Sequence, residues 1–303
     1  MGFNKLVFFI LLSLTFGFAS EQTNQTLSSL SASQNRSLIS YSLDDIVLSY
    51  EKRKLLQNRA VLLHDLKISF KKDLPNGWVG YLFDIDITHQ GKKIFVKDTL
   101  FTNGTEVVGQ LQSLDGVDYK RLMHPTLDKR YYDKKYLIAG NANAVHKLVI
   151  FSEPLCPACV NVLPQYIKEV TSNPTKLSLY YIPMPLSMHY TAKDLVKASI
   201  LAKEQGIENV SLKLYQATSK IYQTNPPLPF DPYKEKDTNI VLELFNKAVG
   251  TNITLEQISN EYLEDEVNKS LNLANEAMVN GTPTIFFDGE IDIFRNKHKP
   301  FSK

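Results

Sequence analysis

The chain contains two cysteines, Cys156 and Cys159, and they stand three positions apart. An apolar run of strand type, residues 147–152, precedes them, and a segment with helical spacing, residues 160–170, follows. A Cys-x-x-Cys pair between a strand and a helix is typical of thiol–disulfide exchange chemistry. Because the chain has no third cysteine, any sulfur chemistry of this protein must take place at this pair.

The position of Cys156 favours a reactive thiolate. If it precedes the first turn of the predicted helix, its sulfur faces unpaired backbone N–H groups and the positive end of the helix dipole. Both lower the thiol pKa and make Cys156 the nucleophile. Pro157 suits the first helical turn, where its missing N–H costs nothing, and Ala158 adds no polar group. Cys159 lies one turn further along, close enough to resolve a mixed disulfide at Cys156.

Two other uses of the pair remain open at this point. A zinc site needs two more ligands, and the 6 histidines are scattered without a His-x3–5-His pair. We therefore expect no metal and no cofactor other than the redox-active Cys156–Cys159 pair. An inert buried pair is the second alternative, because exchange requires an exposure that the residues alone do not show.

The first 19 residues predict a secretory signal peptide. Lys5 supplies the positive charge, residues 6–18 are apolar but short for a membrane span, and Gly17 and Ala19 suit a cleavage site. An uncleaved membrane anchor is the alternative. Export places the cysteines in an oxidising compartment, where a bridge so close in sequence is of little structural use because it closes almost no loop.

Composition and charge narrow the class of protein further. The chain has 303 residues and a formal net charge of +2, with no concentrated basic stretch, so we expect no nucleic-acid partner. Residues 20–40, rich in Ser, Gln, Asn and Thr, predict a disordered leader. The remaining length suits two domains.

The pattern along the chain predicts an α+β protein. Residues 41–112 predict a helix followed by an antiparallel meander, a small sheet that needs a partner surface. Within it, residues 78–88 predict a strand with Tyr81, Phe83, Ile85 and Ile87 on one face. Residues 113–140, polar and tyrosine-rich, predict a linker helix. Residues 141–303 predict an α/β domain with a helical insertion at about 191–277.

Thr282-Pro283 stands directly before the last predicted strand. A proline there suits either a strand start or a cis turn. From the residues alone a plain trans turn is favoured, because the cis isomer is the minority form.

The order of these features resembles the thioredoxin fold: a strand, the Cys-x-x-Cys helix, a strand, a helical insertion and Gly-Thr-Pro-Thr before a strand. Residues 151–159 look like the active-site segment of the DsbC/DsbG family of periplasmic disulfide isomerases, including an acidic residue, Glu153, three positions before the first cysteine. The segment at Gly80-Tyr81 and the hairpin over 91–104 resemble that family's small dimerisation domain.

The resemblance implies roles for particular residues. Cys156 would attack, Cys159 would resolve, and Thr282-Pro283 would form a cis-proline loop that binds extended substrate. Pro157 and Ala158 would modulate the potential; Ala158 departs from the tyrosine or histidine common in that family. Glu153 would either relay a proton to Cys159 or be a surface carboxylate, and we favour the surface position. Two copies would associate through residues 41–112.

The leading interpretation is a periplasmic, homodimeric thiol:disulfide oxidoreductase that acts on cysteines of exported proteins, and we lean toward an isomerase. Its redox partner would be a DsbD-like reductant in the membrane. A dimeric DsbA-like oxidase, served by a DsbB-like oxidant, is the first alternative, and a reductase for cytochrome maturation is another. A chaperone that binds unfolded proteins without redox chemistry belongs to a different class.

Overall fold

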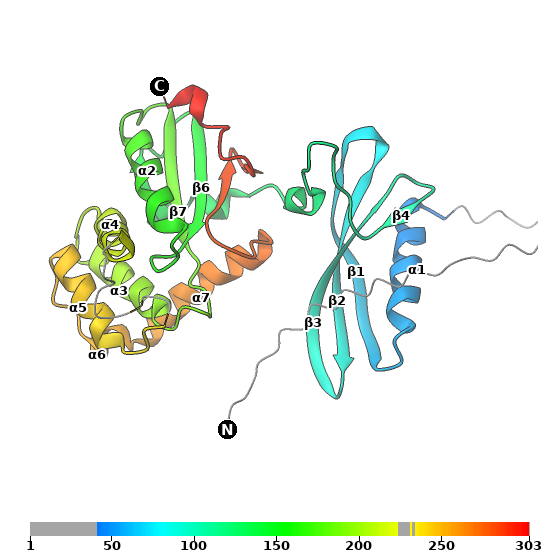
Figure 1. The fold of residues 1–303 in the computed structure, drawn as a ribbon, viewed down its shortest axis with the longest axis horizontal. Coiled ribbons are helices and arrows are strands. Elements are labelled where there is room, and N and C mark those ends of the chain that lie inside the picture. Colours follow the sequence, from blue (N-terminus) through cyan, green and yellow to red (C-terminus); the bar gives the residue numbers. More distant parts are fainter. Residues whose placement is uncertain (1–40, 224–230, 232–233, 303) are drawn as a thin grey trace, which may run out of the picture. The chain divides into compact units, whose positions relative to one another are not determined.

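The computed structural model describes residues 41–223, 231 and 234–302 (Figure 1). The predicted signal peptide and disordered leader, residues 1–40, lie outside the described residues. In the part that is described, we find no helix with both the length and the apolar character needed to span a bilayer. The predicted α+β class is confirmed, with an antiparallel sheet in the N-terminal half and a mixed sheet with helices in the C-terminal half.

The N-terminal half is one helix on a four-stranded antiparallel sheet with strand order β1-β2-β3-β4. Its elements are α1 (Leu43–Leu56), β1 (Val61–Asp73), β2 (Val79–His89), β3 (Lys92–Thr102) and β4 (Val107–Val108). Ser42 caps α1 in a capping box with Asp45, which satisfies backbone N–H groups at the helix start.

The alternation predicted for β2 is confirmed. Its inner face is buried and forms one apolar cluster with Val47 of α1. The members on β2 are Tyr81, Phe83, Ile85 and Ile87. A strand with one buried face fixes its own register, since a slip of one residue would expose this whole set.

The C-terminal half contains a five-stranded mixed sheet with strand order β5-β7-β6-β8-β9. Its strands are β5 (Leu137–Gly140), β6 (His146–Ser152), β7 (Leu177–Pro183), β8 (Thr284–Phe287) and β9 (Glu290–Ile291). Strands β6 and β7 are parallel, and the other neighbours are antiparallel. The helices are α2 (Cys159–Thr171), α3 (Ala192–Glu204), α4 (Val210–Gln223), α5 (Thr238–Val249), α6 (Leu255–Ile258) and α7 (Glu261–Glu276).

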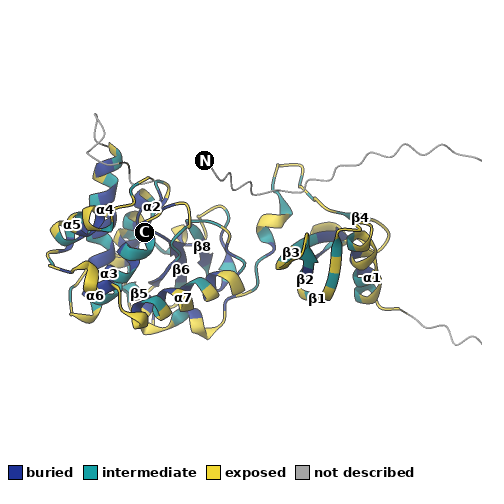
Figure 2. Ribbon diagram, turned by 90° about the horizontal axis from the view of Figure 1, so that it is seen from below, coloured by how far each residue is buried: buried dark blue, intermediate teal, exposed yellow. Residues whose placement is uncertain are grey.

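Strand β6 lies at the centre of this sheet and is buried on both faces, as its dark colour in Figure 2 shows. Val149 and Phe151 join the apolar cluster that includes α7 residues, while Leu148 and Ile150 join the cluster that includes α2 residues. Helices therefore cover both faces of the strand that leads to the cysteines, and its end is rigidly placed. Helices α3, α5 and α6 share a separate cluster around Phe245.

The prediction of a linker helix over residues 113–140 is wrong. The structure has short 3-10 turns there, η2 (Tyr119–Leu122), η3 (Lys129–Tyr132) and η4 (Lys134–Tyr136), followed by β5. Asp118, Asp128 and Asp133 each accept a hydrogen bond from the backbone N–H two residues on, and each starts a new turn. Pro125 also disfavours helical backbone at the residue before it.

Candidate active site

The active-site turn joins the end of β6 to the start of α2. Strand β6 ends at Ser152, and α2 begins at Cys159. The backbone N–H groups of Cys159 and Val160 donate to the carbonyl oxygen of Cys156, at 2.9 and 3.1 Å. Cys156 therefore occupies the position just before the first helical turn, as the spacing predicted.

The two thiols differ in exposure. Cys156 is 6% exposed and Cys159 is fully buried, and both are free thiols. Pro157 is half-buried, and Ala158 is exposed and makes no side-chain cap. Only the first cysteine can meet another molecule without local rearrangement, which separates the two roles sterically.

The Thr282–Pro283 loop closes over this turn from a distant part of the sequence. The peptide bond between these residues is cis, so the trans turn favoured from the residues alone is wrong. The thiol of Cys156 donates to the carbonyl oxygen of Thr282 at 3.5 Å. Strand β8, which pairs with β6, carries the loop to this place.

Hydrogen bonding and burial drive the pKa values of the two thiols apart. Hydrogen bonding from the Cys159 thiol is the largest cause that lowers the pKa of Cys156 to about 6; burial opposes it, and the Thr282 side chain assists. Burial raises the pKa of Cys159 far above its usual value. At neutral pH Cys156 is the thiolate, and Cys159 retains its proton as a hydrogen-bond donor.

Glu153 is not the surface carboxylate that we favoured. It is 0% exposed, accepts a hydrogen bond from the backbone N–H of Leu155 at 3.0 Å, and pairs with Nδ1 of His189. His189 itself is 3% exposed. The loop after β7 brings this histidine beside the active-site turn, an approach that 36 residues of separation conceal in the sequence.

A buried polar group also lies beneath Cys159. The Tyr215 hydroxyl of α4 is hydrogen-bonded to the Ser152 hydroxyl at 2.9 Å and to the Tyr181 hydroxyl at 3.2 Å, and it donates its single proton in one of these two bonds and accepts in the other. Hydrogen bonding from Ser152 acts to lower the pKa of Cys159, against the larger effect of burial. The sequence pattern does not single out Ser152, Tyr181 or Tyr215, because each differs from its neighbours only by a hydroxyl group.

Thr282→Val is expected to raise the pKa of Cys156. The buried Thr282 hydroxyl makes no other hydrogen bond within the described residues, and its interaction with the Cys156 sulfur acts to lower the pKa of that thiol. Its loss removes a donor to the thiolate, worth about 1.5–3 kcal/mol for a charged acceptor, so alkylation at pH 6 should slow several-fold. Iodoacetamide labelling against pH measures the midpoint.

Thr282→Ser is the matched control, because it keeps the hydroxyl. A midpoint unchanged in Thr282→Val would show that this hydroxyl does not interact with the thiolate.

In the described ranges, no group of three or more His, Cys, Asp or Glu side chains is placed to hold a metal ion. The Cys156 and Cys159 thiols are in contact with each other and with Thr282, and not with a histidine ligand set. The arrangement can therefore exchange a disulfide by successive thiolate attack at two sulfurs.

Comparison with known proteins identifies the family. A family model described as Thioredoxin matches residues 133–301, more than half of the 303 residues. The chain belongs to the thioredoxin family. Membership supports the general prediction of a thiol:disulfide oxidoreductase, and it does not distinguish an isomerase from an oxidase. No curated protein matches the sequence.

The solved structures that are similar to this thioredoxin-family chain include the following three. ScsC from Proteus mirabilis, in a compact conformation, is 20% identical, with a TM-score of 0.42 over 54% of this chain and 74% of that chain. The thiol-disulfide exchange protein alpha-DsbA2 from Wolbachia pipientis is 17% identical, with a TM-score of 0.41 over 54% and 81%. A periplasmic thioredoxin-like protein from Salmonella enterica serovar Typhimurium is 18% identical, with a TM-score of 0.40 over 54% and 84%.

Proposed function

We propose that this protein exchanges disulfides in exported proteins, with Cys156 as the attacking and Cys159 as the resolving cysteine. The observation that supports this most directly is the divergence of the two pKa values at one turn. A thiolate with a small exposed area and a protonated, fully buried thiol behind it are the two states that successive attack requires.

The proposed exchange balances in two steps. The Cys156 thiolate attacks one sulfur of a substrate disulfide, that disulfide breaks, and the other substrate sulfur leaves as a thiolate. Cys159 then loses its proton and attacks Sγ of Cys156, which releases the second substrate thiolate. The protein becomes oxidised by two electrons and the substrate becomes reduced by two. If the first released thiolate instead attacks another disulfide of the same substrate, the thiolate freed there attacks the mixed disulfide and expels the Cys156 thiolate, and the result is isomerisation without net redox change.

The thiolate pKa favours an isomerase over an oxidase. Strong stabilisation of the thiolate makes a strong oxidant, as in DsbA, whose cysteine pKa is about 3.5, against about 7 in thioredoxin. Here the pKa is about 6, and the charge of Glu153 opposes further lowering. Ala158 offers no donor to the thiolate, so we propose a mild potential.

Cells are therefore expected to hold the Cys156–Cys159 pair mainly as dithiol. Acid quenching followed by a thiol-alkylating mass tag would shift the band by two tags in growing cells. Samples treated with diamide and with dithiothreitol before quenching mark the fully oxidised and fully reduced positions. A fully oxidised pair in growing cells would refute the isomerase assignment and support the DsbA-like alternative.

The compartment and partners follow from the proposed export. Residues 1–19 supply the signal, and cysteine-containing proteins of the periplasm would be the substrates. Maintenance as dithiol requires an electron donor, and a DsbD-like membrane protein would serve. A DsbB-like oxidant would serve the alternative direction.

We also propose that two copies associate through the N-terminal sheet. Leu62 and Phe95 are 61% and 56% exposed. They lie opposite Thr88 and Asp86 of β2, which point away from the face that packs on α1. Exposed apolar residues on the free face of a sheet are typical of a protein interface.

Leu62→Lys/Phe95→Lys is expected to convert the dimer to a monomer. Two lysines at an apolar contact weaken association by at least about 100-fold, since each costs more than a truncation at a hot spot. Sedimentation velocity at micromolar concentration measures the mass. Phe294→Lys, at a residue 63% exposed in the C-terminal half, is the control. A monomeric parent protein would refute the proposal.

A further inference from the structure

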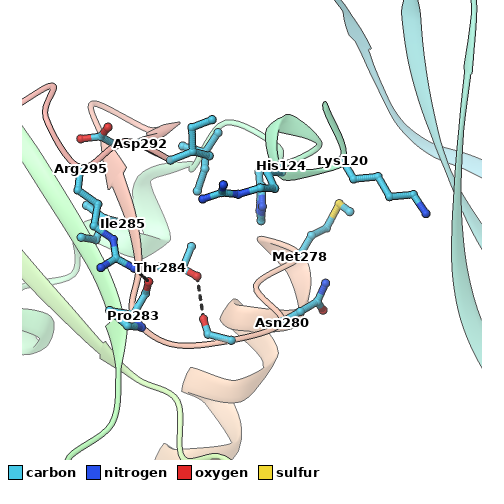
Figure 3. A pocket seen from close by; sticks show the side chains of 13 residues that line it. Lys120, His124, Met278, Asn280, Pro283, Thr284, Ile285, Asp292 and Arg295 are labelled. Carbon is cyan, nitrogen blue, oxygen red and sulfur yellow. Dashed lines mark hydrogen bonds between the residues drawn. The ribbon is translucent and has the colours of Figure 1, made fainter. Parts of the chain in front are cut away.

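A cavity of about 330 Å³ begins at the cis-proline loop. Figure 3 shows it between residues of the linker, which include His124, and residues around Pro283, which include Arg295. The linker is held to this side by hydrogen bonds from His124 to the carbonyl of Ala277 and from the Leu127 N–H to the carbonyl of Gly289. The cavity is at the small end of the range for ligand sites, with room for a few side chains.

The charge of the lining is mainly positive. Lys120, Arg121 and Arg295 all line the cavity. Within the described residues none of these three side chains forms an ion pair with a carboxylate. The carboxylates of Glu290, Glu276 and Glu169 are paired with other residues, namely Lys72, Arg130 and His298. Arg295 donates to the carbonyl of Pro283 at 3.1 Å, which leaves most of its guanidinium donors for another acceptor.

One acidic residue, Asp292, also lines the cavity and offsets part of this positive charge. Asp292 is buried and accepts from the backbone N–H groups of Asn296 and Lys297, at 3.3 and 3.0 Å. Burial lowers the pKa of His124, so its ring is neutral at pH 7. Three basic side chains against one acidic side chain therefore leave the lining basic.

This cavity begins one residue from the carbonyl group that contacts the attacking cysteine. Cys156 contacts the carbonyl of Thr282, and the next residue, Pro283, already lines the cavity. An extended chain advances about 3.3 Å per residue, so side chains a few residues from a reacting cysteine reach the cavity.

We propose that this cavity binds acidic side chains of the substrate polypeptide near its reacting cysteine, so that Arg121 and Arg295 select acidic cysteine-containing segments. The inference rests on the proposed exchange function and adds a substrate class to it. Arginine binds carboxylates through paired, charge-assisted hydrogen bonds, and partly enclosed pairs gain more from this than exposed ones.

The test uses synthetic nonapeptides with a central cysteine in a mixed disulfide with 2-mercaptoethanol. One peptide has Glu at the flanking positions, a second has Gln and a third has Lys. Quenched flow and chromatography measure the second-order rate constant for reduction by the reduced full-length protein. We expect the Glu peptide to react about 5-fold faster than the Gln peptide at low salt, with the preference lost at 0.5 M NaCl.

Variants then locate the preference. Arg121→Gln is expected to reduce the Glu-to-Gln ratio toward one, and Arg121→Glu is expected to favour the Lys peptide. Lys176→Gln/Lys247→Gln removes two exposed charges elsewhere on the same half and should keep the ratio. Because Arg295 also holds the Pro283 carbonyl, Arg295→Gln serves as a second variant and not as the primary one.

The outcomes separate the two proposals. If the parent protein reduces no peptide, the proposed exchange function fails. If it reduces the three peptides at equal rates, or if the remote double variant alters the ratio as much as Arg121→Gln does, the inference is overturned while exchange stands.

Discussion

Cys159→Ser is expected to arrest exchange at the mixed disulfide. In this variant Cys156 still attacks a substrate disulfide, but no second sulfur lies beneath it to release the product. Covalent complexes should accumulate at least about 100-fold over the parent protein, since resolution then depends on external thiols. Non-reducing electrophoresis and mass spectrometry of the periplasmic fraction measure them.

Cys156→Ser is the matched control, because it removes the attacking sulfur and retains the resolving one. It should form no complex and should lose at least about 1,000-fold in disulfide exchange, since a fully buried thiol with a raised pKa cannot replace the slightly exposed thiolate of Cys156. Full in vivo function of Cys156→Ser would contradict redox catalysis and favour the chaperone alternative.

His189→Gln is expected to destabilise the folded protein by about 3–5 kcal/mol, because it leaves the buried Glu153 carboxylate without its cationic partner. Both side chains of the pair are almost completely buried. The unpaired charge also acts to raise the pKa of Cys156, so the midpoint of thiol alkylation should move upward. Urea unfolding of the reduced protein and labelling against pH provide the two measurements.

Glu153→Gln and the double variant Glu153→Gln/His189→Gln complete a cycle. The double variant should be more stable than His189→Gln alone, because no charge remains buried and amide groups can still bond to the Leu155 N–H. Additive losses in the two single variants would show that the pair is not coupled and would contradict the prediction.

The contribution of the pair should depend on pH. Burial lowers the pKa of His189, but the hydrogen bond and charge of Glu153 outweigh it, and the net pKa in the folded protein is raised. Folding then favours the protonated ring. The stabilisation is fully present below the pKa of the unfolded chain, about 6.5, and is lost as the pH rises through the folded value. The parent protein should exceed Glu153→Gln in stability by more at pH 5.5 than at pH 9.

Local patterns were sufficient to predict the elements near the chemistry. The apolar run before Cys156 became β6, the helical spacing after it became α2, and the alternation around Phe83 became the inner face of β2. These strand and helix patterns involve only residues that are close in sequence, so they can be recognised without knowledge of the tertiary structure. The prediction of a linker helix over residues 113–140 failed because several short turns, each capped by a side chain, have the same polar composition as an exposed helix.

The surroundings of the cysteines required the fold. Glu153 and His189 are individually ordinary polar residues, and only their approach across the active-site turn makes them a buried pair. The cis isomer of the Thr282–Pro283 peptide bond could not be predicted from local preference either, because the trans isomer is favoured in an isolated chain. Tyr215 reaches Ser152, 63 residues earlier in the chain, because α4 packs beside α2.

The sequence by itself determined the chemistry available to this protein: one Cys-x-x-Cys pair, between a strand and a helix, with no other thiol in the chain. The tertiary structure decided how the two sulfurs differ. The hydrogen bonds from Cys159 and Thr282 stabilise the thiolate at Cys156, and deep burial keeps the proton on Cys159. Desolvation and hydrogen bonding act through space, and so their sum depends on segments that only folding brings together.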